Sequence, residues 1–167
     1  MGLTGAKPVY WYALHIRSNA EKKAQELLQQ RHIPEYLPLY TEKRRWTDRT
    51  KTIERPVFPG YLFARFDPEM QKRDILAVPG VLRILGAPDP IAVKDDEIEN
   101  IRRLVEAGPV LPCGPVVGET VVVRKGPLAG VIGTVQKIKG AFRVVVNVHL
   151  LNRAVAAEVD ADSIAKA

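Results

Sequence analysis

Cysteine and histidine are scarce in this chain of 167 residues, which has one cysteine and three histidines. Cys113 cannot form a disulfide within the chain, and the histidines lie far apart in the sequence. No group of these residues therefore has the spacing of a metal site. Chains without internal disulfides are typical of reducing compartments, so we expect a cytoplasmic protein with no metal or other cofactor.

Long hydrophobic runs are also absent. No apolar run approaches the roughly 20 residues that a membrane-spanning helix needs, and residues 1–8 contain no apolar stretch suited to secretion. Hydrophobic residues still make up 46% of the sequence, which argues for a packed core and against disorder. The length allows one domain of about 100 residues and a second small one. We expect a monomeric globular protein that makes no membrane contact.

The motifs of common enzymes are missing. The sequence contains neither a Gly-x-Ser-x-Gly elbow nor a Cys/His nucleophile signature. Gly126, Gly130 and Gly133 follow one another closely, but no Gly-Lys-Ser/Thr ending follows them, so turns explain these glycines better than a phosphate loop. The acidic residues at 95–99 suit the N-terminus of a helix. We therefore expect a binding protein and not an enzyme.

Positive charge is concentrated in one short segment. The formal net charge is +6, and residues 43–55 contain six basic and two acidic residues, a local charge of +4. Such a segment is a candidate contact for nucleic acid, although solvated charges on a loop would give the same pattern. The basic residues are Lys43, Arg44, Arg45, Arg49, Lys51 and Arg55.

The first two thirds of the sequence alternate between strand and helix patterns. Ser18 and Glu21 have the spacing of a capping box for the first helix, and Asp67 with Pro68 fits the start of the second. The segment 46–51 is the polar tip of a predicted hairpin. We predict strands at 10–16, 36–45, 52–57, 60–66 and 81–85, and helices at 19–31, 68–77 and from 95 onward.

After this region the composition changes. Residues 107–115 are rich in proline and glycine and show neither a helical nor a strand period, which is typical of a linker. Beyond them only strands are predicted, at 120–124, 131–138, 142–151 and 154–159. So short an all-β segment favours a small barrel, because closure removes exposed strand edges.

Aromatic residues gather around a Pro-Gly break in the fourth predicted strand region. Strand alternation places Tyr61 and Phe63 on the face opposite Leu62, so both faces of this strand are apolar or aromatic. Either helices cover both faces of the sheet, or one face is an exposed docking patch.

Several of these segments resemble the NusG family. The N-terminal (NGN) domain of that family is similar to Trp11-Tyr12-Ala-Leu, Phe58-Pro-Gly-Tyr-Leu-Phe63 and Val78-Pro-Gly-Val81, and its KOW motif is similar to residues 118–135. The resemblance implies an α+β fold, in which an NGN α/β sandwich with a mostly antiparallel sheet precedes a KOW barrel of about five strands. The implied boundaries are 8–107 for the NGN domain, 108–117 for the linker and 118–167 for the barrel.

The resemblance also implies a function without chemistry. The family's first domain docks an apolar concavity on the clamp helices of the largest subunit of bacterial RNA polymerase, and this docking suppresses pausing. Such docking is physically reasonable, because a helical tip binds well where aromatic side chains anchor it in a pocket from which water is excluded. The residues implied to line this surface are His15, Phe58, Pro59, Tyr61, Phe63, Val81 and Ile84.

The basic hairpin would then lie near upstream DNA or the non-template strand. Its basic residues would contact phosphates and Trp46 would stack on a base, or Trp46 would pack against its own hairpin. The segment 46–51 is similar to that of UpxY antiterminators, and 55–69 to that of RfaH, so we expect a specialised antiterminator. The residues implied to contact nucleic acid are Arg17, Arg44, Arg45, Trp46, Arg49 and Lys51.

The barrel of the general factor presents two aromatic residues to Rho or ribosomal protein S10. Here Leu128 and Leu151-Asn152-Arg153 occupy the corresponding positions, so the arginine is retained and both aromatics are lost. Valine runs at 121–123 and 144–146 disfavour helix, and we expect a stable, freely linked barrel. The alternative function is that of a ribosome- or RNA-binding protein with a KOW barrel.

Overall fold

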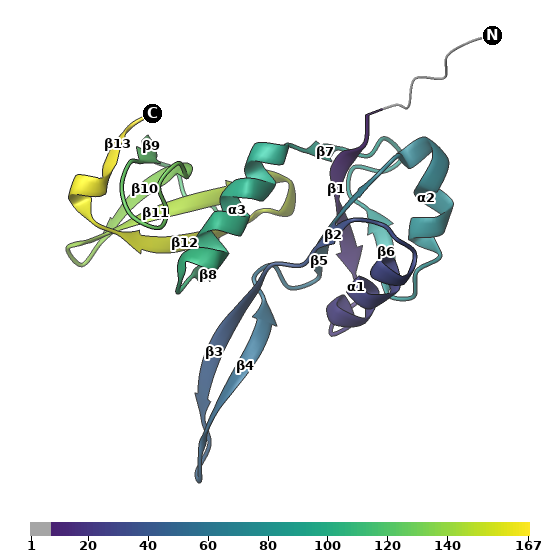
Figure 1. Ribbon diagram of the computed structural model, residues 1–167, viewed down its shortest axis with the longest axis horizontal. Coiled ribbons are helices and arrows are strands. Elements are labelled where there is room, and N and C mark those ends of the chain that lie inside the picture. Colours follow the sequence, from purple (N-terminus) through teal and green to yellow (C-terminus); the bar gives the residue numbers. More distant parts are fainter. Residues whose placement is uncertain (1–7) are drawn as a thin grey trace. The chain divides into compact units, whose positions relative to one another are not determined.

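The computed structural model describes residues 8–167 (Figure 1). The segment 1–7, which covers most of the stretch in which we expected no secretion signal, lies outside the described residues. Contacts divide the chain into two units. The first unit comprises the chain up to Leu37 together with Gly60–Asp95, and the second comprises Pro38–Pro59 with Asp96–Ala167. Within the described residues the fold is a mixture of three α-helices and antiparallel sheets, in agreement with the predicted class.

The first unit is built on an antiparallel sheet with β1 at its centre. Hydrogen bonds order the strands β2-β5-β1-β6, and β7 also pairs with β1. The β1–β5 ladder runs from Tyr10 opposite Phe66 to His15 opposite Tyr61. The predictions of β1, β5 and β6 are confirmed to within a residue. The strands are β1 (Tyr10–Ile16), β2 (Glu35–Tyr36), β5 (Tyr61–Phe66), β6 (Val81–Ile84) and β7 (Ala92–Val93).

Two helices belong to this unit, α1 (Glu21–Gln30) and α2 (Pro68–Leu76). Helix α2 begins as predicted, because Asp67 Oδ1 accepts a hydrogen bond from the Glu69 backbone N–H at 2.9 Å and proline occupies the first turn. Ala24 and Leu28 of α1 and Ile75 of α2 are fully buried. These apolar helix faces supply the core of the first unit together with the inner side chains of β1 and β5.

The predicted capping box at the start of α1 is wrong. The residue that caps the helix is Ala20, which has no side-chain oxygen to offer. Ser18 lies one turn too early, because the Ala20 N–H bonds back to Arg17 O at 3.0 Å and Asn19 adopts a left-handed φ of 64°. This extra turn separates the serine from the helix N-terminus and leaves the Glu21 carboxylate for another partner.

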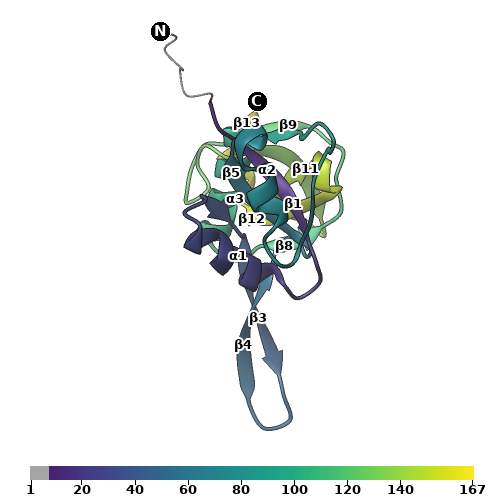
Figure 2. The ribbon, with the colours of Figure 1, turned by 90° about the vertical axis from the view of Figure 1, so that its right-hand side faces the viewer.

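A long hairpin, β3 (Leu39–Arg45) and β4 (Thr50–Pro56), belongs to the second unit (Figures 1 and 2). The pairing is continuous from Leu39 opposite Pro56 to Arg45 opposite Thr50, and Trp46 N–H donates to Arg49 O at 2.8 Å to close the turn. The single predicted strand at 36–45 is divided into β2 and β3. Pro38 stands between them and has no N–H to give to a ladder.

The rest of the second unit consists of α3 (Asp95–Ala107) and a six-stranded antiparallel sheet, which we call the C-terminal sheet. Its strand order is β13-β9-β10-β11-β12-β8. As predicted, Ile98, Ile101 and Leu104 form the buried face of α3. The strands are β8 (Leu111–Cys113), β9 (Thr120–Val123), β10 (Ile132–Ile138), β11 (Ala141–Val148), β12 (Arg153–Val159) and β13 (Ile164–Lys166).

The segment that the sequence indicates as a linker is tied to this sheet. Residues Leu111–Cys113 form β8 and pair with β12, although their proline and glycine neighbours show no strand period. Further on, the side chain of Asn147 accepts from Val116 N–H and donates to Val116 O, both at 2.8 Å. Part of the predicted linker is therefore bound to the C-terminal sheet.

Candidate functional site

The clearest aromatic feature at the surface of the first unit is the pair His15 and Tyr61. The two residues face each other at the end of the β1–β5 ladder, and their rings stack at 5.4 Å between centroids and 28° between planes. Both side chains are partly exposed, as is Val81 at the start of β6, while Pro59 just before Gly60 is exposed. The first-unit residues His15, Tyr61 and Val81, which we call the ladder-end surface, remain available to a partner.

A buried carboxylate holds this surface in place. Glu21 is only 7% exposed, and its Oε1 accepts a hydrogen bond from Gly60 N–H at 3.0 Å. Gly60 in turn accepts from Ile16 N–H at 2.7 Å and adopts a φ of 84°, which glycine tolerates. The turn before Tyr61 is thus fixed to both β1 and α1. Sequence reasoning assigned Glu21 to a capping box and missed this role, for which the sequence offers no signal.

Three predicted contact residues are instead parts of the core. Phe58 and Ile84 are each 1% exposed and Phe63 is 0% exposed. Strand pairing explains two of them: Phe63 lies opposite Ala13 and stacks on Tyr36 at 6.5 Å, and Ile84 lies opposite Leu14. The prediction that these side chains line an open surface is corrected. Their aromatic and aliphatic character reflects packing.

The hairpin divides the predicted basic residues between its two faces. Register places Arg44 opposite Lys51 on one face and Arg45 opposite Thr50 on the other, while Arg49 lies in the turn. Like charges directly opposite one another are destabilising in a bare hairpin. Glu42 balances only part of this charge, with its Oε2 at 2.8 Å from Arg55 Nε and 3.8 Å from Arg44 Nε. A surplus of positive charge therefore remains at the tip.

Trp46 lies beside this charge and is half open to solvent. Its side chain is 52% exposed, and the Lys51 ammonium lies 5.9 Å from the ring centroid. The ring thus lies against a side chain of its own hairpin, and about half of its surface remains open to solvent. Arg17 is exposed in the first unit. It lies next to the 79–80 turn, where its backbone N–H donates to Gly80 O at 2.7 Å.

The C-terminal sheet buries two of its four candidate contact residues. Leu128 is 7% exposed and Leu151 is 3% exposed, so these aliphatic replacements are packed in the core and are not accessible to a partner. Asn152 and Arg153 are exposed; Asn152 has a left-handed φ of 52° and ends a 3-10 turn. Arg153 Nη1 donates to Asn152 O at 3.1 Å. Only this Asn-Arg pair is accessible as predicted.

The pKa of the Cys113 thiol and that of the Tyr12 phenol are both raised. Burial raises the pKa of the Cys113 thiol, and the Arg143 guanidinium partly opposes this. Burial also raises the pKa of the Tyr12 phenol, with further contributions from Asp67 and Tyr10. Across residues 8–167 no cluster of three or more His, Cys, Asp or Glu side chains could hold a metal ion. None of the helices described has the length and apolar character to cross a membrane.

Comparison with known proteins decides the family. The family model described as "Transcription termination factor nusG" matches residues 9–102, which is more than half of the chain. The chain belongs to the NusG family. The match covers the first unit, the hairpin and part of α3, and so includes the ladder-end surface.

Curated NusG relatives match far beyond the region of the family model. The transcription termination/antitermination protein NusG of Staphylococcus carnosus is 26% identical over 174 residues, which cover 93% of this chain and 94% of the relative. The NusG protein of Staphylococcus aureus strain Mu50 matches with the same identity and the same coverage. The similarity therefore includes the C-terminal sheet, and transcription and antitermination describe this group of proteins.

Solved structures agree on the fold. The structure described as "Domain interaction in Thermotoga maritima NusG" superposes with a TM-score of 0.58 and 20% identity, over 97% of this chain and 99% of that one. At this identity the likeness establishes the mixed α/β fold of a NusG protein and nothing finer.

Proposed function

We propose that this NusG-family chain is a transcription elongation and antitermination factor that binds the clamp helices of the largest subunit of bacterial RNA polymerase and suppresses pausing there. The observation that carries the proposal is the nearly full-length match to transcription termination/antitermination proteins. We assign residues 8–107 to an NGN domain, 108–117 to a linker and the C-terminal sheet to a KOW barrel. The factor acts by binding in the cytoplasm, as a monomer.

The ladder-end surface is the proposed contact with the polymerase. The stacked rings of His15 and Tyr61 give it a rigid aromatic anchor, and Val81 adds aliphatic area. A few residues carry most of the binding energy of a protein interface, and tyrosine is common among them. Phe63 and Ile84, which are buried within β5 and β6, then fix the strands that carry the surface.

The hairpin tip is the proposed contact with upstream or non-template DNA. Arg44, Lys51 and Trp46 lie together there, which combines phosphate neutralisation with a stacking ring. Arg45, Arg49 and Arg17 would add further phosphate contacts. The likeness of this tip to UpxY proteins supports the more specific proposal of a specialised antiterminator.

For the C-terminal sheet we propose a protein partner, with Rho and ribosomal protein S10 as the candidates. The exposed pair Asn152 and Arg153 and the turn that carries Leu128 would form the contact.

Retention on immobilised core RNA polymerase tests the main proposal. Tyr61→Ser removes one ring of the stacked pair, and we expect retention to fall about tenfold, the loss that follows removal of a single anchor. Tyr10→Ser is the matched control, because Tyr10 is half exposed at the opposite end of the same ladder. Circular dichroism shows whether both variants are folded.

The proposal fails if the folded wild-type chain is not retained, or if Tyr61→Ser binds like the control. Retention on ribosomal subunits in place of polymerase would favour the alternative of a ribosome-binding KOW protein. Pausing assays on operon-leader templates then separate a specialised antiterminator, active on some leaders, from a general factor active on all.

A further inference from the structure

The first unit has a second surface, at the Tyr10 end of the β1–β5 ladder and thus at the opposite end from Tyr61. A hollow of about 480 Å³ lies there, lined by the start of β1, the start of α2 and the loop between β6 and β7. Protein sites for ligands usually measure about 300–1,000 Å³. We call it the β1-start hollow, and neither the proposed polymerase contact nor the proposed DNA contact uses it.

Tyrosines and prolines form the apolar part of the β1-start hollow. Tyr10 and Tyr12 lie two positions apart on β1, and therefore on the same face of the strand. Tyr10 is 50% exposed, whereas Tyr12 is 6% exposed and its ring lies 5.0 Å from that of Phe66, between centroids. Four prolines supply further lining, and their fixed φ leaves little backbone freedom to be lost on binding. The hollow is therefore preformed.

Negative charge surrounds these rings. Asp67, Glu69 and Asp89 line the hollow together with Lys72, and three carboxylates with one ammonium give a local formal charge of −2 on a chain of net charge +6. Asp67 and Glu69 also suit the N-terminus of α2, but Asp89 lies in a loop and serves no helix. Carboxylates repel phosphates, so the hollow is not suited to nucleic acid.

An aromatic surface with rigid walls is typical of sites for proline-rich peptides, and the carboxylates add a preference for positive charge. We propose that the β1-start hollow binds an extended segment of a partner protein in which prolines stand beside lysine or arginine. The proline rings stack on Tyr10, and a basic side chain pairs with Asp89.

Tyr12 supports the backbone of such a segment. An extended proline-rich peptide makes no internal hydrogen bonds, so its carbonyl groups need donors. Burial raises the pKa of the Tyr12 phenol, and Asp67 adds to this, so the hydroxyl keeps its proton and can donate it.

Selection from a library tests the inference without polymerase. The immobilised chain is panned against phage that display short random peptides. We expect it to enrich peptides in which proline lies next to lysine or arginine. Enrichment of no peptide, of acidic peptides or of peptides without proline would overturn the inference.

Fluorescence anisotropy of one selected peptide then locates its site. Asp89→Lys turns an attraction into a repulsion, so we expect the affinity to fall about tenfold at low salt and the difference to shrink as salt is added. Asp74→Lys is the matched control, because Asp74 is exposed on α2 and does not line the hollow. It should bind like the wild type, and circular dichroism shows whether both variants are folded.

Equal affinities of the wild type and Asp89→Lys would contradict the inference, and so would an equal loss in Asp74→Lys. Glycine in place of the peptide's prolines should abolish binding, and a peptide that binds unchanged after this replacement would also contradict it. Because no polymerase is present, failure of the proposed function would appear separately, in the retention assay.

Discussion

At the scale of single residues, the structure separates side chains that pack in the core from side chains that remain accessible to a partner. Phe58 and Phe63 drew attention in the sequence because they are aromatic, yet both are buried. Tyr61 differs only in its place at the end of the ladder, where its ring meets His15. Aromatic content therefore predicts a cluster, and only the strand register determines which ring remains accessible.

Glu21 offers a direct test of how the ladder-end surface is positioned. Glu21→Ala removes the acceptor of Gly60 N–H in a part-buried place, so we expect the free energy of unfolding to fall by about 1–3 kcal/mol. Urea denaturation measures this. Glu26→Ala is the control on the same helix, because Glu26 is exposed and its carboxylate pairs with the exposed Lys23 at 3.4 Å; a change above about 0.5 kcal/mol there would be unexpected.

An equal, small effect of the two substitutions would show that Glu21 does not anchor the turn.

The N-cap predicted from the sequence at Asp67 is correct, whereas the one predicted at Ser18 is wrong. The difference arises because a left-handed residue, Asn19, adds a turn before α1, and no local pattern specifies that turn.

The reactivity of the Cys113 thiol should depend on pH differently in the folded and the unfolded chain. Burial raises the pKa of its thiol, so the thiolate, which is the reactive form, appears at higher pH in the folded chain than in the unfolded one. We expect the pH profile of iodoacetamide alkylation to have a higher midpoint in buffer than in urea. The thiol of the folded chain stays protonated up to a higher pH than the thiol of the unfolded chain. The stability that it contributes is therefore present below the unfolded pKa and is lost as pH rises from there through the folded pKa. A native midpoint at or below that in urea would contradict the prediction.

At the scale of elements, period and turn residues predicted most strands and helices. The errors have identifiable causes. Pro38 divides one predicted strand into β2 and β3, and β8 forms in a proline-rich segment because β12 offers it a partner. Pairing of β8 with β12 is a tertiary effect that overrides local propensity. The residues of β8 alone do not show that another strand will pair with them.

The hairpin makes a prediction at this scale, because its basic residues should act together on phosphates. Arg44→Ala combined with Lys51→Ala removes two positive charges that face each other across the hairpin. We expect the slope of log K against log salt for a single-stranded DNA oligonucleotide to become shallower by about 1.4, at about 0.7 per phosphate contact. Fluorescence anisotropy at several salt concentrations measures the slope.

The control for the hairpin is a pair of cations on α2, Lys72→Ala with Arg73→Ala, which carries the same change of charge. This pair should weaken binding little and leave the slope near the wild-type value. Equal slopes for the two double variants would mean that net charge alone, and not the hairpin, attracts DNA.

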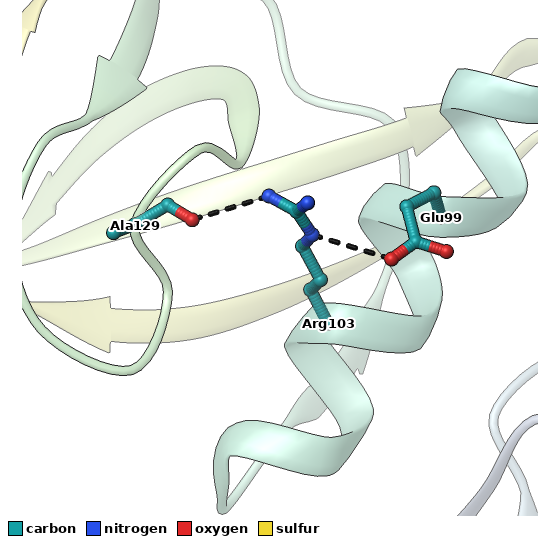
Figure 3. Close-up of polar contacts among 3 residues, drawn as sticks. All are labelled: Glu99, Arg103 and Ala129. Carbon is teal, nitrogen blue, oxygen red and sulfur yellow. Dashed lines mark hydrogen bonds and ion pairs between the residues drawn. The ribbon is translucent and has the colours of Figure 1, made fainter.

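At the scale of the whole molecule, the sequence resemblance and the comparisons agree on the NusG family, while the contacts along the chain group α3 and the hairpin with the C-terminal sheet. The order of motifs was sufficient to predict the family and the fold class. It was insufficient for the contacts of α3, because the Arg103 guanidinium donates a hydrogen bond to Ala129 O at 3.2 Å (Figure 3), and a backbone acceptor leaves no trace in the side-chain pattern.

Hydrogen exchange should rank the parts of the molecule by their pairing. Strand β1 pairs with β5, β6 and β7, and most of its side chains are buried, so its amides should exchange only on global unfolding. Among the described strands, β3 and β4 pair with no others and are largely exposed, and an isolated two-stranded hairpin is marginally stable. We therefore expect the amides of β3 and β4 to exchange orders of magnitude faster than those of β1. Mass spectrometry of the exchanged chain measures both. Protection of β3 equal to that of β1 would show that the hairpin is held by more than its own ladder, and a tip so fixed could not adjust to a nucleic-acid strand.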